Sequence, residues 1–331
     1  MTARNWPVDP AKATLDDFYT QDPVMQACLD RARVAARARL PILILGESGA
    51  GKTILARAVH NSSDRRTGPF VSFNAAALSD TLLDSQLFGH ERGAFTGAQH
   101  RLKGKFELAH QGTLFLDEVA DLTAAAQGKI LRAVETGEFE RLGSEVLQQA
   151  DVRLISATHF RVDPGGADGR LRHDLFFRIA GITITVPPLR DRPNDLPMLL
   201  AHEIELAAAR HGKTIVGLDR PAADRLLAYS WPGNLRELSS VVHAAVALAP
   251  NDVVSEDLLL LVDEPAGATP VVAGAAVTGG QGRLLRDVVH RHIVDVLAAV
   301  GGNKRRAARE LGVSRATLDR KLLDAPRSKH R

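Results

Sequence analysis

The sequence predicts an α/β fold with a parallel sheet, followed by an α-helical subdomain and a small all-α domain at the C-terminal end. Three observations predict this arrangement. Five short apolar, β-branched runs alternate with helical stretches in the first 186 residues, which is typical of a parallel sheet covered by helices. After Pro187 the strand pattern gives way to helical periodicity. A basic segment, set apart by an almost uncharged stretch, closes the chain.

The individual elements follow from these patterns. Strands are expected at Ile42–Leu45, Phe70–Phe73, Thr113–Leu116, Val152–Ile155 and Ile182–Val186. Helices of the second subdomain are expected at Leu196–Leu206, Pro221–Tyr229 and Leu235–Leu248, because prolines and glycines separate these stretches. Asp263–Gly282 is rich in Ala, Gly, Pro and Val and is expected to be a linker. Apolar residues from Leu284 to Val300 recur at three- and four-residue spacing and predict an amphipathic helix.

Composition narrows the class of protein. The 331 residues suffice for about two domains, and 45% hydrophobic with 24% charged residues is ordinary for a folded protein. No apolar run approaches the roughly 20 residues that span a bilayer, and the N-terminus lacks a secretory signal, so we expect a cytoplasmic protein without a membrane partner. The single cysteine, Cys28, forms no internal disulfide or thiol cluster, which argues against redox and zinc chemistry.

The net charge of +3 hides an asymmetry along the chain. Residues 303–331 contain ten Lys or Arg against three Asp or Glu, a local net charge of +7, which leaves −4 on the rest. A basic cluster on a mildly acidic body predicts one surface for a polyanion rather than a protein that coats nucleic acid everywhere.

A glycine-rich segment directly follows the first expected strand. Its residues are Gly46, Glu47, Ser48, Gly49, Ala50, Gly51, Lys52 and Thr53, and they match G-x-x-x-x-G-K-[ST]. Glycines let backbone N–H groups curl around phosphate oxygens, while Lys52 adds a cation at the β- and γ-phosphates and the Thr53 hydroxyl ligates Mg²⁺. The alternative is a chance glycine-rich turn.

Two carboxylates, Asp117 and Glu118, close the third expected strand. Asp117 is expected to hold Mg²⁺ through water, and Glu118 to polarise the water that attacks the γ-phosphate. A strand that ends in two acids is often only solvated charge, but together with the glycine-rich segment it predicts ATP hydrolysis.

The segment Glu91–Ala98 contains an unusual hexapeptide, Gly93, Ala94, Phe95, Thr96, Gly97 and Ala98. Glycines around a single exposed aromatic residue and a threonine suit a mobile loop tip that presents Phe95 and Thr96 to a partner, although an ordinary surface loop is the alternative. The hexapeptide GAFTGA resembles the hallmark of bacterial enhancer-binding proteins, the AAA+ activators of sigma-54 RNA polymerase. The resemblance covers roughly Phe18 to Leu322.

The resemblance implies a domain plan and further site residues. It implies an N-terminal segment (1–17), an AAA+ α/β ATPase subdomain (18–190), a helical lid (191–262), the linker (263–282) and a Fis-type helix-turn-helix domain (283–331). It implies that Gly93–Ala98 contact sigma-54, that Asn74 switches Glu118 between competent and resting positions, and that Arg236 is the second sensor. Arg172 and Arg178 match paired arginines that reach the nucleotide of a neighbouring subunit, which requires a homo-oligomer, by analogy a ring of six.

The sequence departs from the family pattern at two positions. The first sensor is usually Ala-Thr-Asn, whereas here Thr158 is followed by His159. An imidazole still donates to a phosphate or holds a water, but its charge depends on pH. Thr53 stands where these activators commonly carry glutamate, and it restores the general phosphate-loop pattern.

The basic end reads as two helices joined by a glycine turn. Ser314 is a candidate N-cap of the second helix, and the expected DNA-binding residues are Arg305, Ser314, Arg315, Thr317, Arg320 and Lys321. The alternative is a solvated basic helix pair, against which the local charge argues.

Only about 40 residues precede the first expected strand, too few for the sensor module that these activators often carry. The chain therefore resembles the kind without an N-terminal regulatory domain, controlled by a partner protein in trans or by its expression level, unless the 331 residues are part of a longer chain. Taken together, the expected function is an ATP-hydrolysing activator that binds upstream enhancer-like DNA and remodels the closed sigma-54 polymerase complex. Two alternatives remain, a DNA-binding regulator with a vestigial ATPase and an AAA+ remodelling motor of another pathway.

Overall fold

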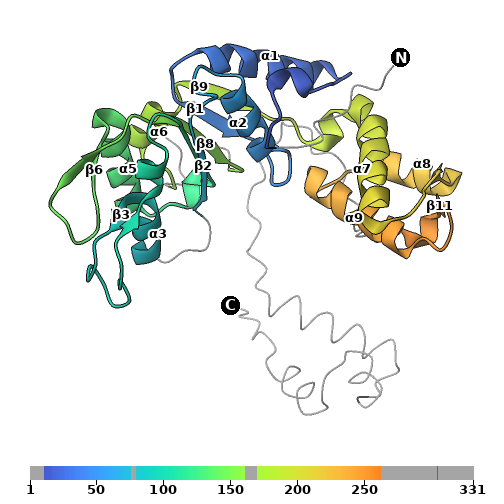
Figure 1. The fold of residues 1–331 in the computed structure, drawn as a ribbon. Helices are drawn as coiled ribbons and strands as arrows, with labels where there is room; N and C mark the ends of the chain where they lie inside the picture. Colours follow the sequence, from blue (N-terminus) through green and yellow to red (C-terminus); the bar gives the residue numbers. More distant parts are fainter. Residues whose placement is uncertain (1–10, 76–79, 161–169, 262–303, 305–331) are drawn as a thin grey trace, which may run out of the picture. The chain divides into compact units, whose positions relative to one another are not determined.

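The computed structural model of the chain describes residues 11–75, 80–160 and 170–261 together with Lys304 (Figure 1). Except for Lys304, all of these belong to the first of two units, Met1–Val262, the second being Asp263–Arg331. The expected linker, the amphipathic helix from Leu284 to Val300 and the helix-turn-helix residues therefore lie outside the described residues. The architecture below is that of the first unit.

A parallel sheet forms the centre of the α/β part, with the strand order β2-β5-β8-β1-β9. Its strands are β1 (Ile42–Leu45), β2 (Phe70–Asn74), β5 (Thr113–Asp117), β8 (Arg153–Thr158) and β9 (Ile182–Thr185). Neighbouring strands are parallel throughout. All five expected strands are confirmed, and three of them run further than predicted, to Asn74, Asp117 and Thr158. The last residues of these three strands, Asn74, Asp117 and Thr158, are polar and lie at one edge of the sheet, whereas β8 begins one residue later and β9 ends one residue earlier than predicted.

Alternation along β1 explains why the sheet needs helices on both faces. Ile42 and Ile44 pack into one apolar cluster with α1 (Pro23–Arg37) and α2 (Lys52–Asn61), and both are fully buried. Leu43 points to the opposite face and packs into a second cluster, which includes residues of α3 (Asp80–Phe88), α5 (Ala124–Thr136) and α6 (His173–Ile179). Successive strand side chains point to opposite faces, so a continuous apolar run is the pattern of a strand covered on both sides.

Helices cover this sheet and begin at recognisable capping residues. The remaining helices of the α/β part are α3 (Asp80–Phe88), α4 (Lys105–Leu108), α5 (Ala124–Thr136) and α6 (His173–Ile179). The Asp22 side chain accepts a hydrogen bond from the Val24 amide at the start of α1, with Pro23 at the first helical position. Thr123 caps α5 in the same way, and Gly137 ends it in the left-handed conformation.

A helical subdomain follows the sheet, as the sequence predicts. It contains α7 (Leu196–His211), α8 (Arg220–Ala228) and α9 (Asn234–Leu248), with the short parallel pair β10 (Gly217–Leu218) and β11 (Val253–Val254). Helix α7 is longer than expected because no breaking residue interrupts it before Gly212, which terminates it with a φ of 62°. The core includes Trp231, 1% exposed, whose indole N–H donates to the Leu226 carbonyl.

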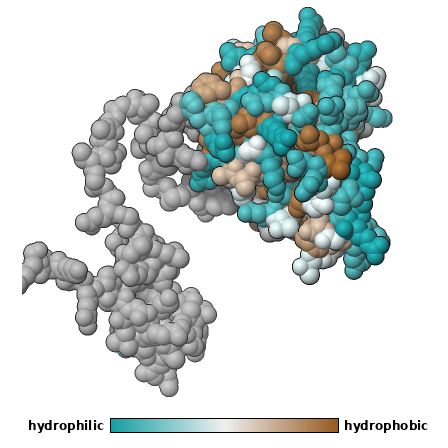
Figure 2. All heavy atoms as spheres, turned by 90° about the vertical axis from the view of Figure 1, so that its left-hand side faces the viewer, coloured by the Kyte–Doolittle hydropathy of each residue, from teal (hydrophilic) through white to brown (hydrophobic). Residues whose placement is uncertain are grey.

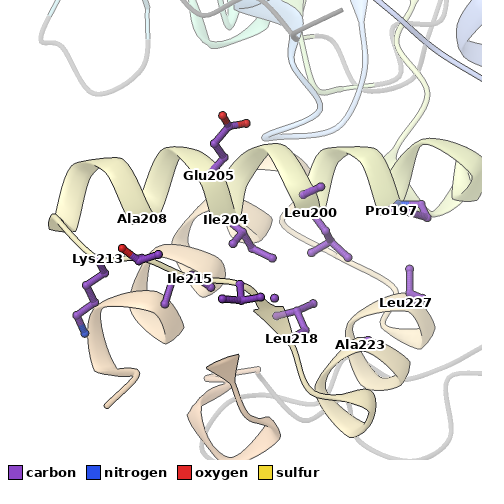
Figure 3. Close-up of a pocket in the computed structure, with 14 residues that line it drawn as sticks. Pro197, Leu200, Ile204, Glu205, Ala208, Lys213, Ile215, Leu218, Ala223 and Leu227 are labelled. Carbon is purple, nitrogen blue, oxygen red and sulfur yellow. The ribbon is translucent and has the colours of Figure 1, made fainter. Parts of the chain in front are cut away.

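An apolar groove of about 600 Å³ lies between α7, α8 and the segment that joins them. Figure 3 shows Leu200 and Ile204 of α7 pointing towards Ile215 and Leu218, whereas Glu205 points away from the groove. No described residue that lines this groove belongs to the glycine-rich segment Gly46–Thr53 or to the end of β5.

Two short antiparallel hairpins were not predicted from the sequence. They are β3 (Gly89–His90) with β4 (Leu102–Lys103), and β6 (Glu138–Glu140) with β7 (Leu147–Gln149). Strands of two or three residues leave too short an alternation to recognise. Figure 2 views the molecule from the side of these hairpins and shows a largely hydrophilic face with small, separate apolar patches.

Within 11–75, 80–160 and 170–261, no helix has both the length and the apolar character that crossing a membrane requires.

Replacing Ile44 with valine should test how tightly the sheet is packed. Ile44 is fully buried in β1, an inner strand between β8 and β9, so the lost methyl group leaves a small cavity, and we expect about 1 kcal/mol less stability. Urea unfolding of the full chain, followed by circular dichroism, measures the change. Val34→Ala on α1, where the side chain is 68% exposed, is the control and should shift the curve far less. An equal shift in both variants would contradict the packing shown for β1.

Candidate functional site

The phosphate-binding segment Gly46–Thr53 connects β1 to α2 at the carboxyl edge of the sheet. Gly49 has a φ of 75°, and a Cβ there would lie 2.3 Å from the Gly233 carbonyl oxygen, so only glycine fits. Gly51, with a φ of 107°, begins α2 and points the first amides of the helix into the loop. The loop thus offers backbone donors and a helix N-terminus, the arrangement that binds phosphate.

Lys52 is the buried cation of this loop. Its side chain is 6% exposed, and its Nζ donates to the carbonyl oxygens of Gly46 (2.8 Å) and Glu47 (3.1 Å). The same Nζ lies 3.7 Å from Glu118 Oε1. Lys52 and Glu118, 66 positions apart in the chain, are therefore in one site, as the sequence predicts.

The acidic pair stands where β5 ends. Asp117 is the register partner of Asn74 on β2, so the strand ends bring both side chains to the same edge. Burial raises the pKa of Asp117, and the neighbouring charge of Glu118 raises it further. Glu118 adopts a left-handed conformation with a φ of 54°, which turns its side chain out of the strand direction.

Glu118 is held by the residue that follows β8. Its Oε2 accepts hydrogen bonds from the His159 backbone amide (3.1 Å) and from the ring Nδ1 (2.7 Å). Thr158, by contrast, is fully buried, and its hydroxyl accepts a hydrogen bond from the Phe160 amide at 3.2 Å. Of the two expected first-sensor residues, only His159 reaches a group of the site.

The lid subdomain contacts the phosphate loop directly. Arg236 donates from its guanidinium to Ser48 Oγ at 2.9 Å, and the Leu235 amide donates to the Gly49 carbonyl at 3.1 Å. The expected second-sensor residue therefore lies at the loop of its own chain.

Asn234 is a functional residue that sequence reasoning missed. It is fully buried, its amide donates to the Ser48 carbonyl (3.0 Å) and to Glu47 Oε2 (3.2 Å), and its Oδ1 accepts from the Leu189 amide (2.7 Å). A signal was present, since Pro-Gly-Asn before a helix favours a left-handed residue, and Asn234 has a φ of 54°.

The Glu47 side chain binds neighbouring protein groups rather than a phosphate. Both of its oxygens bind the Arg190 guanidinium, at 2.8 and 2.5 Å. These hydrogen bonds from Arg190, opposed by partial burial and aided by Asn234, lower the pKa of Glu47. Among the expected phosphate-loop residues, Glu47 thus contributes its backbone to the phosphate site and its carboxylate to the contact with Arg190 and Asn234.

These parts enclose a pocket of about 300 Å³. The loop, the end of β5 and the lid helices α7 and α9 line it, with Ser48, Gly49, Gly51, Lys52, Thr53, Ile54, Asp117, Glu118, Leu199, Glu203, Leu235, Arg236 and Ser239. Sequence reasoning gave no role to Leu199, Glu203 or Ser239, because on a helix they belong to an ordinary amphipathic pattern. The pocket combines phosphate donors, a cation and a carboxylate positioned to act on water, which suits phosphoryl-group hydrolysis.

Arg178 lies on α6 and Arg172 directly precedes this helix, and neither lines this pocket in the described part of the chain. Both are exposed. Arg172 binds Asp174 at 2.7 Å, and this hydrogen bond lowers the pKa of Asp174 to about 2. Arg178 donates to the carbonyl oxygens of Val134 and Glu135 at the end of α5.

The hexapeptide Gly93–Ala98 lies between β3 and β4. The Gly93 amide donates to the Ala98 carbonyl at 2.8 Å and closes the loop. Thr96 is exposed, but the expectation that Phe95 is exposed is wrong: Phe95 is half-buried, and its ring meets the His90 ring edge-on with 5.1 Å between centroids. Aromatic rings gain from such contacts, so Phe95 folds back onto β3.

The base of this loop is fixed by a buried arginine. Arg141 is 6% exposed in its side chain and binds Glu91 at 2.9 Å and Glu107 at 2.7 Å. The expected DNA-binding residues, Arg305, Ser314, Arg315, Thr317, Arg320 and Lys321, lie outside the described residues.

Three protein-family models match consecutive parts of the chain. They are described as Sigma-54 interaction domain (residues 18–185), AAA+ ATPase lid domain (190–264) and Bacterial regulatory protein, Fis family (284–324).

Individual proteins are also similar to this chain. Transcriptional regulatory protein ZraR of Escherichia coli (strain K12) is 42% identical over 91% of this chain and 67% of its own. DNA-binding transcriptional regulator NtrC of Azospirillum brasilense is 39% identical over 92% of this chain and 68% of its own. Crystal structures of NtrX from Brucella abortus, in complex with ADP and with ATP, are 34% identical and cover 92% of this chain and 68% of their own, with TM-scores of 0.68 and 0.67.

Proposed function

The chain belongs to the sigma-54-dependent transcriptional activators, ATPases that join a sigma-54 interaction AAA+ domain to a Fis-family DNA-binding domain. On this basis we propose which residues bind ATP, hydrolyse it and contact the partners. ATP binds in the pocket between the phosphate loop and the lid. Hydrolysis moves the loop Gly93–Ala98 against sigma-54, and the basic C-terminal domain holds the protein on upstream enhancer-like DNA. The observation that carries the proposal is that Lys52, Asp117 and Glu118 meet at one phosphate loop in the chain that also carries GAFTGA.

The ATPase step follows from these contacts. Loop amides and Lys52 bind the β- and γ-phosphates, so negative charge that develops on the γ-phosphoryl group meets a fixed cation. Glu118 accepts a hydrogen bond from the attacking water and orients it. Arg236 bridges lid and loop through Ser48 and so transmits phosphate release to α9.

Magnesium fits this pocket. Two adjacent carboxylates, with the pKa of Asp117 raised by burial and by Glu118, favour a divalent cation beside them, and the Thr53 hydroxyl adds an oxygen ligand. Asp117, through water, and Thr53 would hold the ion, which when bound neutralises phosphate charge.

A homo-oligomer, by family analogy a ring of six, completes the site. Arg172, at the start of α6, and Arg178, within it, are exposed and do not line the pocket of their own chain in the described residues, which supports a role at the nucleotide of a neighbour. Phe177, 60% exposed between them, adds apolar surface for such a contact. We expect this assembly in the cytoplasm, with a regulatory protein acting in trans as a further partner.

Replacing Thr96 with alanine should separate ATP hydrolysis from polymerase remodelling. Thr96 is exposed at the loop tip and far from the pocket residues in sequence, so we expect kcat for ATP to change less than about twofold and open-complex formation with sigma-54 polymerase to fall at least about tenfold. Single-round transcription from a sigma-54 promoter, beside an ATPase assay, measures both. Gln99→Ala, just outside the hexapeptide, is the control. Undiminished transcription by the Thr96 variant would refute the proposed contact.

A further inference from the structure

His159 stands at the position of the first sensor but makes its contacts with Glu118. Two N–H groups of His159, the backbone amide and ring Nδ1, point at the same carboxylate oxygen at 3.1 and 2.7 Å. The Glu118 side chain is 15% exposed and that of His159 37% exposed, so the contact is partly shielded from water. Hydrogen bonds to a carboxylate strengthen as water is excluded.

The chemistry of the pair fixes which ring nitrogen carries a proton. An ionised carboxylate only accepts hydrogen bonds, so Nδ1 must carry the proton and donate it to Glu118. The donor atom is bonded directly to Cγ of the side chain. Another residue type can therefore reproduce the contact only if it also carries an N–H donor on an atom bonded to Cγ.

The imidazole ring of His159 also contacts the ring of the next residue, Phe160. Its centroid lies 3.8 Å from that of the Phe160 ring, and the Arg170 guanidinium lies 4.1 Å from the Phe160 ring centroid. Arg170 in turn lies near Asp121, at 3.9 Å. The two rings are tilted by 40° and in close contact, which hinders rotation of the imidazole about χ2 and favours one direction of the Nδ1–H bond before substrate binds.

Holding Oε2 orients the second oxygen. Glu118 Oε1 faces Lys52 Nζ at 3.7 Å, on the side where the loop binds phosphate. Among described residues Glu118 and Lys52 line the nucleotide pocket, and His159 does not. His159 therefore acts on the reaction through Glu118 rather than by touching a phosphate.

We propose that His159 is a positioning residue of the ATPase: its Nδ1–H and backbone N–H hold Oε2 of Glu118, so that Oε1 is presented to the attacking water. This inference rests on the proposed function of Glu118 as the water-orienting base. Histidine can take the place of the usual asparagine in this role, since the asparagine amide nitrogen is also bonded to Cγ and donates from the same place. The glutamine amide nitrogen is one bond further out.

Three substitutions test the position of the donor. His159→Ala should lower kcat about 10- to 100-fold, because a misdirected base loses its alignment with the water. His159→Asn should retain kcat within about threefold, and His159→Gln should fall with the alanine variant. KM for ATP and the affinity for ADP should stay within about twofold in all three, since no contact to the phosphate loop is lost. Thermal unfolding and oligomeric state, measured for each variant, confirm that the assemblies compared are the same.

The kinetic results for these variants either support or overturn the positioning role of His159. An unchanged or increased kcat in His159→Ala, equal losses in the asparagine and glutamine variants, or a loss confined to KM would overturn the positioning role. Glu118→Gln, measured in parallel, keeps the two proposals apart. If it abolishes hydrolysis while His159→Ala is fully active, only the inference on His159 fails. If it leaves hydrolysis intact, the role proposed for Glu118 fails first.

Discussion

Glu118→Gln is expected to lower kcat for ATP hydrolysis about 100- to 10,000-fold while ATP still binds, because glutamine keeps the shape of the side chain but does not accept the proton of the attacking water. The phosphate loop and Lys52 remain in place, since the carboxylate lies 3.7 Å from Lys52 Nζ and is not its hydrogen-bond partner. Phosphate release under saturating ATP measures kcat. Titration of a fluorescent ATP analogue measures affinity.

The control for this substitution is Glu145→Gln, the same chemical change at an exposed residue of the β6–β7 hairpin. It should leave both quantities unchanged. Hydrolysis by the Glu118 variant within tenfold of the natural protein would mean that another group activates water, and the proposed mechanism would have to be abandoned.

Arg178→Ala and Arg172→Ala are expected to lower kcat about 1,000-fold or more in the assembled protein, with ATP affinity of each chain retained. The reason is that both arginines are exposed, at the start of α6 and within it, and neither lines the pocket of its own chain in the described residues, so we propose that they stabilise charge on a neighbour's nucleotide. The same phosphate-release assay, at protein concentrations where the oligomer forms, measures the effect.

Mixing variants distinguishes action in trans from a local defect. Arg178→Ala chains keep Glu118, and Glu118→Gln chains keep Arg178, so a mixed oligomer contains complete sites at their boundaries and should regain activity that neither variant has alone. Arg220→Ala on α8, where the side chain is 92% exposed, is the matched control. Mixtures as inactive as their components would argue that Arg178 acts within its own chain.

Most of the fold could be predicted because its signals are local and long enough to read. The strands are short, mainly apolar runs, and the breaking residues Gly212 and Pro232 bound the lid helices. The hairpins β3–β4 and β6–β7 could not be predicted, since two- and three-residue strands depend on tertiary partners such as Arg141 with Glu91 rather than on their own pattern.

In the candidate site, too, some residues could be predicted from the sequence and some contacts could not. Lys52 and Glu118 could be predicted, because phosphate chemistry requires a lysine after the glycine-rich loop and a carboxylate at the end of a neighbouring strand. The hydrogen bonds between His159 and Glu118 could not be predicted, because they depend on the left-handed conformation of Glu118 and on the contact of the His159 ring with Phe160. Phe95 was expected to face solvent, and the neighbouring His90 ring, whose position depends on the β3–β4 pairing, explains why it does not.

The carboxylate of Glu47 joins three segments, because it binds Arg190, 143 positions along the chain, and Asn234, 187 positions along. A change of charge at residue 47 leaves Arg190 facing a like charge or none, and only a second change, at residue 190, restores attraction. We therefore expect residues 47 and 190 to tolerate a change of charge only together. The identity of residue 47 is thus tied to its contacts with Arg190 and Asn234 as well as to the phosphate loop.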